Sequence, residues 1–396
     1  MRSTEPYRLT FWRAFFFLVL AAGLTVAVVR YTQGLGAVTN LNDNFPWGIW
    51  IGFDLLCGVG LAAGGFTLTA MVYLFNLKRF QPIVRPTVLT AFLGYALVIV
   101  ALLLDLGRPW NIWHPIVMWN PRSVMFEVGW CVMLYTTVLL LELTGMIFER
   151  LKWERAVKIQ HAATVPLVIC GVLLSTLHQS SLGALYLIAK TKLYPLWYSA
   201  ALPWIFWSSA IAAGLAMVIV ESNLSARAFK RQLELPLLQE VARVLLVALG
   251  VTGVFRIYDL IHRHVLHLAL QWTYEAAFFQ LEILAGVILP FFLLAVPSWR
   301  IRPRVMYAAS LLAVMGFVVN RLNVSVTGLE TSAGQHYQPA WGEILISVLM
   351  VSVGFAAFAL AVRYFRVFPE PEEGDHPSPA PDPVFRSRLA STNRVV

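Results

Sequence analysis

Charged residues are scarce in this chain. Asp, Glu, Lys and Arg make up 13% of its 396 residues, whereas 59% are hydrophobic and the mean hydropathy is +0.70. Soluble domains usually carry about twice that charged share. The composition therefore excludes an ordinary soluble protein. Because a run of about 20 apolar residues spans the hydrocarbon core of a bilayer, the chain is long enough for ten membrane spans.

Cysteine is scarce as well. Cys57, Cys131 and Cys170 all lie in apolar runs, and none belongs to a CxxC or CxxCH motif. Such motifs are typical of zinc, iron–sulfur and covalent haem sites. We therefore expect no metal site, iron–sulfur cluster or haem in this chain. The 30 Lys and Arg residues are not clustered as a nucleic-acid surface requires.

Ten apolar runs predict an all-α, polytopic membrane protein of about ten transmembrane helices in bundles. The runs fall at about 12–31, 48–77, 87–106, 123–147, 161–178, 202–222, 241–262, 275–297, 305–320 and 342–364. Small basic groups separate alternate runs, and the positive-inside rule assigns these groups to the cytoplasm. The chain is then a multi-pass protein of the bacterial inner membrane with both termini in the cytoplasm.

The same assignment divides the chain into three parts. Residues 1–11 form a cytoplasmic N-terminus, 12–366 the transmembrane domain, and 367–396, rich in Pro and acidic residues, a disordered cytoplasmic tail. The first run lacks a convincing cleavage site and is interpreted as a retained signal anchor. The loops expected outside are 32–47, 107–122, 179–201, 263–274 and 321–341.

Ionisable residues inside the predicted spans are the main functional signal, because each costs roughly 2.5–3.5 kcal/mol at a helix centre. Most gather near the outer helix ends: Asp54, Asp105, Glu127, His178, Arg256, Asp259, Glu282, Arg321 and Glu343. The inner halves hold Glu142, Glu221 and Arg243. This distribution favours a polar site that is reached from the outer side rather than a continuous polar pore.

Some of these residues have a simpler interpretation. Arg256 and Asp259 are three residues apart, as are Asp105 and Arg108, so each pair can be a structural ion pair. Glu221 can pair with a loop arginine such as Arg227.

Asp54, Glu127 and His178, in contrast, have no partner nearby in the sequence, and for them we favour a function. Asp54 follows a polar turn and precedes a stretch of small residues at 58–65 that lets neighbouring helices approach closely. His178 opens a polar run that we expect to end the fifth helix. A quinone requires a flat apolar slot, hydrogen-bond partners and a protonatable group, and histidine titrates near physiological pH.

Several motifs resemble the polysulfide reductase membrane-subunit (NrfD/PsrC-like) family, and within it the HybB-type membrane subunit of periplasmic nickel–iron hydrogenases. They are NxxFPWGxWIxFD at 42–54, DLGRPWN at 105–111, SVMFE at 123–127, LHQSSLG at 177–183 and the turn Pro195–Trp197. The resemblance implies a subunit that passes electrons between menaquinone or ubiquinone and a periplasmic ferredoxin-like iron–sulfur protein, which contacts a catalytic subunit. The positions that match the family's quinone site are Asn44, Trp50, Asp54, Glu127, His178 and Gln179.

Other functions stay open at this point. The complex can be a sulfur-compound oxidoreductase instead of a hydrogenase. A haem-b cytochrome could ligate haem through His178 with His114 or His262. A transporter or a passive anchor would explain the apolar helices but not the shallow, one-sided polar groups.

Two further predictions concern coupling and docking. Glu142 or Glu221 could begin a hydrated proton path to the outer site, although Glu142 lies about 22 Å from Glu127 along one helix. The iron–sulfur partner is expected to dock on loops 107–122 and 179–201.

Overall fold

The computed structural model describes residues 11–368. Within this range ten helices are long and apolar enough to cross a membrane, and there is no β-strand. The all-α, ten-helix prediction is therefore confirmed. The predicted N-terminal segment and the predicted tail lie almost wholly outside the described residues.

Several of the spans are built from more than one helical segment. In chain order they are α1 (Phe11–Gln33); η2 (Trp50–Leu55), α2 (Leu56–Leu61), α3 (Gly64–Thr69) and η3 (Ala70–Leu74); α4 (Gln81–Asp105) after η4 (Lys78–Phe80); α6 (Val124–Arg150); α7 (Glu154–Leu185) with η6 (Tyr186–Ala189); α8 (Leu202–Ala228); α9 (Leu235–His262); α10 (Tyr274–Ile283), η8 (Leu284–Ile288) and α11 (Leu289–Ala295); α13 (Pro303–Leu322), η9 (Asn323–Thr327) and α14 (Gly328–Ala333); and α15 (Trp341–Tyr364). Two short helices, α5 (His114–Val117) and α12 (Pro297–Arg300), lie in connections.

Two predicted boundaries are wrong. The fifth span does not end near His178 but continues to Leu185 and then as a 3₁₀ turn to Ala189. The ninth span continues to Ala333 and occupies most of the predicted outer loop 321–341. In both cases polar residues of the added segment or of the segment before it, such as Gln179 and Asn323, are buried and hydrogen-bonded to other helices, so the helix has no reason to stop.

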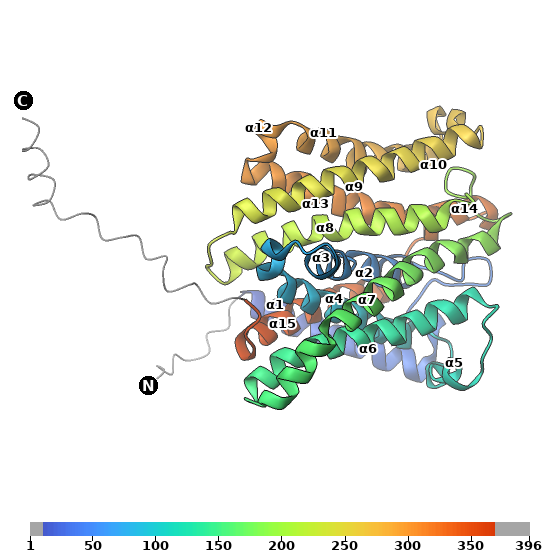
Figure 1. Cartoon of the computed structure of the whole chain (residues 1–396). Coiled ribbons are helices and arrows are strands. Elements are labelled where there is room, and N and C mark those ends of the chain that lie inside the picture. The colour runs from blue at the N-terminus through green and yellow to red at the C-terminus, as the bar shows by residue number, and fades with distance from the viewer. Residues whose placement is uncertain (1–10, 369–396) are drawn as a thin grey trace, which may run out of the picture.

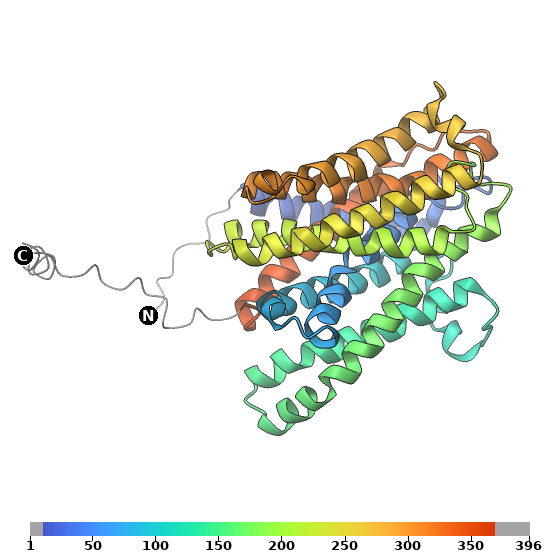
Figure 2. The same ribbon diagram turned by 45° about the horizontal axis from the view of Figure 1, so that its top comes forward.

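The helices form two groups on either side of a central pair, which consists of α8 and the second span with its segments α2 and α3 (Figure 1). α9, α11 and α13 lie on one side of this pair, and α4, α6 and α7 lie on the other. The turned view gives the same order (Figure 2). α1 and α15 run side by side at the edge of the molecule. The second span is central, because 89% of its most apolar window is buried, against 11% for α1 and for α7.

The connections gather at two ends. One end carries residues 34–49, 106–123, 190–201, 263–273 and 334–340, and we call it the tryptophan-rich end. The other carries residues 75–80, 151–153, 229–234, 296–302 and 365–368, and we call it the arginine-rich end. At the tryptophan-rich end a hydrogen bond joins two connections, from the Asn40 side chain to the Gln338 carbonyl (2.9 Å). At the opposite end Arg85 pairs with Glu149 (2.6 Å).

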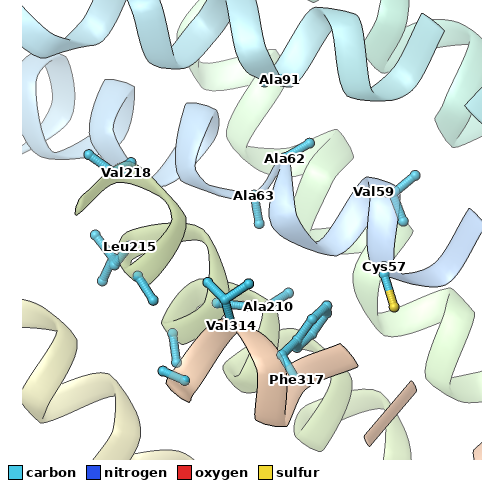
Figure 3. Packing of buried hydrophobic residues seen from close by; sticks show 14 of the residues in the cluster. Cys57, Val59, Ala62, Ala63, Ala91, Ala210, Leu215, Val218, Val314 and Phe317 are labelled. Carbon is cyan, nitrogen blue, oxygen red and sulfur yellow. The ribbon is translucent and has the colours of Figure 1, made fainter. Parts of the chain in front are cut away.

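Close packing at the centre depends on small residues. A Cβ added to Gly64 would lie 2.7 Å from the carbonyl oxygen of Gly214, which no side chain tolerates. Figure 3 shows the surrounding contact, in which Ala63 of the second span faces α8 and α13. Because lipid is as apolar as the helices, such van der Waals contact, rather than hydrophobic burial, holds membrane helices together.

Candidate functional site

Asp54 is presented by a π-helical turn, Trp50–Leu55, that begins the protein's most buried span. Its side chain is 7% exposed, and its Oδ2 accepts a hydrogen bond from the Ser347 hydroxyl of α15 (2.7 Å). π-Helical turns are frequent at functional sites, because the extra residue re-aims the side chains around it. A carboxyl that is buried in a membrane span and bonded to one neutral hydroxyl is able to accept or release a proton.

Trp50 and Glu343 fix this turn against α15. The buried Trp50 indole donates to the Glu343 carbonyl oxygen (3.1 Å). The Glu343 carboxylate is fully buried and accepts from the backbone N–H groups of Asn40 and Ala340 (3.0 Å each) and from the Tyr337 hydroxyl. Burial, together with this carboxylate, raises the pKa of Tyr337 well above its usual value, so the hydroxyl stays protonated and donates. Trp50 therefore has a positioning role here.

The predicted pair of Asp105 and Arg108 does not form. Arg108 is exposed, and Oδ1 of Asp105 is buried without a hydrogen-bond partner among residues 11–368. The basic residue near Asp105 is instead Arg30 of α1, which is 4% exposed and donates to the carbonyl oxygens of Leu104 (2.5 Å) and Leu106. The chain turn after Asp105 aims Arg108 outward, so spacing alone misassigned the partner.

His178 lies in a second polar cluster, two helical turns before the end of α7. Its Nδ1 is 2.7 Å from the Tyr95 hydroxyl of α4, and its Nε2 has no partner within the described range. Gln179 donates to the Val59 carbonyl oxygen (3.1 Å), and its Oε1 is likewise unpaired. Both side chains are fully buried. Unsatisfied buried polar atoms are costly, so two of them at adjacent positions suit a bound water or a ligand.

Glu127 and Asn44 differ in how they relate to this cluster. Glu127 lies in the first turn of α6, is exposed, and accepts from the Ser181 hydroxyl (2.6 Å), one turn along α7 from His178. Asn44 is exposed in the turn before the second span, where its N–H donates to the Asn42 side chain (3.0 Å). The structure therefore brings Glu127 to the His178 side and leaves Asn44 at the surface.

The six positions that match the family's quinone site therefore do not form one cluster. Asp54 and Trp50 contact α15, whereas His178 and Gln179 lie on α7, where Gln179 reaches the second span at Val59 and His178 contacts Tyr95 of α4. The two polar clusters lie about 7 Å apart along the helix, measured from Asp54 to Val59 at 1.5 Å per residue. The predicted single layer of polar groups is therefore two separate layers, with His178 deeper than expected.

Arg256 does not pair with Asp259 as the sequence suggested. Its guanidinium contacts the Glu282 carboxylate from α10, and both are buried. Asp259 instead pairs with Arg263 (2.6 Å) and accepts from Ser199. The remaining acceptor positions of Glu282 take hydrogen bonds from Trp197, Asn320 and Asn323. A buried guanidinium is stabilised by a desolvated carboxylate, and Glu282 of the facing helix supplies one to Arg256.

Arg321 is a buried cation that the sequence did not assign. It is fully buried, and its guanidinium lies between the rings of Phe206 (3.7 Å) and Phe317 (4.3 Å). It donates to the Phe206 carbonyl, the Ser209 hydroxyl and Asn320 Oδ1. Cation–π contact and neutral acceptors thus hold it in place. No sequence signal pointed to Phe206, since that contact crosses 115 residues.

Glu142 and Glu221 lie on the arginine-rich side. Glu142 lines a cavity of about 90 Å³ together with Tyr73, Gln160 and His161. Glu221 lines a cavity of about 50 Å³ that also contacts Ser222 and Arg231. The alternative ion pair of Glu221 with Arg227 does not form within residues 11–368, because the Arg227 guanidinium lies over the Tyr307 ring (5.5 Å).

Each histidine that the sequence offered as a haem ligand contacts an aromatic side chain. Within residues 11–368 no group of three His, Cys, Asp or Glu side chains could hold a metal ion. A haem b requires two facing axial ligands. His161 and His178 share α7 but are about 26 Å apart along it. The Tyr95 hydroxyl bonds Nδ1 of His178 and leaves its Nε2 without a partner in the described range, while His114 packs edge-on against Trp113 (4.5 Å) and His262 stacks on Tyr258 (5.8 Å).

Comparison with known proteins identifies the family. Residues 37–334 match the profile of the family described as "Polysulphide reductase, NrfD". This chain belongs to the NrfD polysulphide reductase family.

Three relatives align along nearly all of the NrfD-family chain. A protein of Nitratidesulfovibrio vulgaris is 44% identical over 344 residues, or 85% of this chain and 88% of its own length. The probable Ni/Fe-hydrogenase 2 b-type cytochrome subunit of Escherichia coli is 34% identical over 358 residues, covering 89% and 91%. The integral membrane subunit of menaquinone reductase from N. vulgaris is 29% identical over 398 residues, covering 91% and 92%. Each is a protein to which this NrfD-family chain is similar.

Proposed function

We propose that this chain is the quinone-reactive subunit of a periplasm-facing oxidoreductase complex of the bacterial inner membrane. Electrons pass between a ferredoxin-like iron–sulfur partner and the menaquinone or ubiquinone pool. A nickel–iron hydrogenase is the leading catalytic partner, and a sulfur-compound oxidoreductase is the alternative. The names of the E. coli hydrogenase subunit and of the menaquinone reductase subunit support this proposal.

The observation that carries the proposal is the pair of buried protonatable groups beside the second span. Asp54 with Ser347 and His178 with Tyr95 each combine one titratable group with one hydroxyl, within a wholly helical membrane protein. Reduction of a quinone consumes two electrons and two protons, and its oxidation releases them. Two adjacent proton donors or acceptors match that stoichiometry, while the electrons come from a partner.

The tryptophan-rich end is proposed to face the periplasm and to bind that partner. The charge bias supports the orientation. Residues 107–122 expose large apolar side chains there, among them Trp110 (68% exposed) and Trp119 (65%). The second proposed docking segment, 179–201, is narrower than expected, because Leu193, Leu196 and Trp197 are buried within this chain. Only residues 188–192 of that segment present a continuous surface.

A proton path from the arginine-rich end is the second part of the proposal. A Cβ added to Gly171 would lie 3.8 Å from Glu142 Oε1 and 3.6 Å from the Tyr135 ring, so these two side chains flank one position of α7. The Tyr135 ring packs edge-on against Tyr95 (4.7 Å), whose hydroxyl meets His178. Side chains thus occupy the interval of about 22 Å that separates Glu142 from Glu127.

The test uses the complex purified through a tag on this chain, with co-purifying subunits identified by mass spectrometry. We expect an iron–sulfur protein and a catalytic subunit. His178→Ala and Asp54→Asn should abolish turnover with a quinone analogue, while artificial-dye activity of the partner subunits persists. Wild-type quinone activity in both variants would reject the assignment, and an intense haem absorption band in the chain purified alone would favour the cytochrome alternative.

A further inference from the structure

A long apolar groove runs along the membrane face of the protein between α1, the start of the second span, and α15. Its volume is about 1050 Å³. Phe16 of α1, Phe53 of η2, and Val351, Phe355 and Ala356 of α15 line its wall. It is separate from the cavities at Glu142 and Glu221, which share none of its lining residues.

The polar groups of this groove are placed unevenly. Ser347 lines it, and the Ser347 hydroxyl donates to the carboxyl of Asp54, the residue that follows the groove residue Phe53. Ser347 lies six residues after the start of α15, about 9 Å below that end of the helix. From Ser347 to Ala359, the last groove residue of α15, the wall extends about 18 Å further along the helix. Apart from the Ser352 hydroxyl, that stretch of α15 presents apolar side chains, and Arg13 near the start of α1 is the charged residue in the groove lining.

We propose that this groove binds the isoprenoid tail of a membrane quinone and directs its ring to Ser347 and Asp54. The inference rests on the proposed function, and it specifies the substrate as a long-tailed quinone that arrives laterally from the bilayer. A neutral ring with two oxygen atoms fits the polar end, since the Ser347 oxygen can accept from a quinol hydroxyl while it donates to Asp54. A hydrophobic tail of several isoprene units fits the rest.

A phospholipid fits this groove less well. The groove lining offers its anionic phosphate one cation, Arg13 near the start of α1, whereas the Ser347 end is about 9 Å deep and is backed by a carboxyl. That carboxyl, when ionised, repels a phosphate rather than binding it. A lipid acyl chain alone would leave Ser347 without a partner on the groove side.

The test compares two substrates in the assembled complex, in lipid nanodiscs: a quinone with its full isoprenoid tail and the same ring without a tail. Ala356→Phe narrows the groove and should raise the KM ratio of long-tailed to tail-less quinone about tenfold, equivalent to 1.4 kcal/mol. Leu360→Phe is the matched control. Leu360 lies on the same helix, is 57% exposed, does not line the groove, and should leave the ratio unchanged.

A second measurement identifies the occupant directly. A quinone with a photoreactive tail should label peptides of α1 and α15, and excess long-tailed quinone should suppress the labelling. Suppression by phospholipid alone, labelling confined to other helices, or capture of a partner's helix in the groove would overturn the proposal, as would an unchanged KM ratio in Ala356→Phe. If the wild-type complex reduces or oxidises no quinone at all, the proposed function itself fails. If the wild-type complex uses both quinones and the KM ratio is the same in Ala356→Phe, only the groove assignment fails.

Discussion

The Tyr95 hydroxyl lies 2.7 Å from Nδ1 of His178, and both side chains are fully buried between α4 and α7. This contact fixes the ring of His178 so that Nε2, the nitrogen without a described partner, points away from Tyr95. A tyrosine that sets the tautomer of a histidine controls which nitrogen exchanges a proton. Tyr95 is therefore a positioning residue for the deeper of the two polar clusters.

Tyr95→Phe should lower quinone-linked turnover at least tenfold, because the imidazole loses its orienting partner. Leaving a buried nitrogen unsatisfied costs about 1–3 kcal/mol, so the variant should still assemble. Tyr31→Phe is the control, since the Tyr31 hydroxyl also makes a hydrogen bond, to the backbone carbonyl of Leu103 (3.0 Å), but lies exposed on α1. Turnover and its pH profile are measured alongside dye activity. Equal losses of quinone and dye activity would mean that Tyr95 stabilises the fold and does not position His178 for the quinone reaction.

The sequence predicted this site incompletely, and His178 illustrates why. The cost of an ionisable group in a membrane span identified His178 and Asp54 without any structure. Their partners, Tyr95 and Ser347, are single polar residues within apolar runs and lie 83 and 293 residues away. Helical periodicity carries no information on such tertiary contacts, so neither partner was foreseen.

The ion pairs fail for a related reason. The spacing of three residues on α9 favoured an ion pair between Arg256 and Asp259. The partner of a side chain on a buried helix face, however, depends on which helix packs against that face. Glu282, 26 residues later, faces Arg256 across the bundle. Helix number and type, in contrast, depend only on local apolar length, and these predictions are confirmed.

Removing the carboxyl of Asp54 should abolish quinone turnover, while removing its partner should only weaken it. Asp54→Asn keeps the shape but cannot accept a proton. Ser347→Ala loses one hydrogen bond, worth about 0.5–1.5 kcal/mol, and should reduce turnover about threefold to tenfold. Asp43→Asn, at an exposed position of the preceding turn, should behave as wild type. An Asp54→Asn variant that turns over quinone normally would exclude this carboxyl from the proton transfer.

The Arg256–Glu282 pair should matter for stability rather than for turnover. Removing either partner leaves an uncompensated buried charge, which costs about 3–5 kcal/mol. Arg256→Gln and Glu282→Gln should each lower the thermal midpoint in detergent, and the double variant should lose less than the sum of the two. Arg243→Gln breaks an exposed pair with Glu240 on the same helix and should change little. Additive losses would mean that the two side chains do not interact.

Single cysteines at the tryptophan-rich end should capture the iron–sulfur partner. Positions 110 and 119 expose indole rings, and a cysteine at either should cross-link in the assembled complex. Position 190 should cross-link as well, whereas position 197 should not, because Trp197 is buried against Glu282. A cysteine at Trp299, on the arginine-rich end, is the control. Capture from position 299 alone would reverse the proposed orientation.

The last prediction concerns the path from the arginine-rich end to His178. If protons enter there while electrons arrive at the tryptophan-rich end, each quinone reduced moves charge across the membrane. Glu142, with its cavity beside His161, and Glu221, with its cavity beside Arg231, are the two candidate entrances. Glu142 is followed by a column of side chains, in which Tyr135 contacts Tyr95 and Tyr95 contacts His178.

We therefore expect Glu142→Gln to reduce charge movement per quinone by at least half in proteoliposomes that contain an internal pH dye. Tyr135→Phe should have the same effect, because the Tyr135 hydroxyl is buried without a partner in the described range and is free to bond a water molecule in the column. Glu221→Gln tests the other entrance. Glu149→Gln, which breaks the exposed pair with Arg85 at the same end, is the control and should keep the wild-type ratio. If Glu142→Gln and Glu221→Gln both retain wild-type charge movement, neither carboxyl carries the proton.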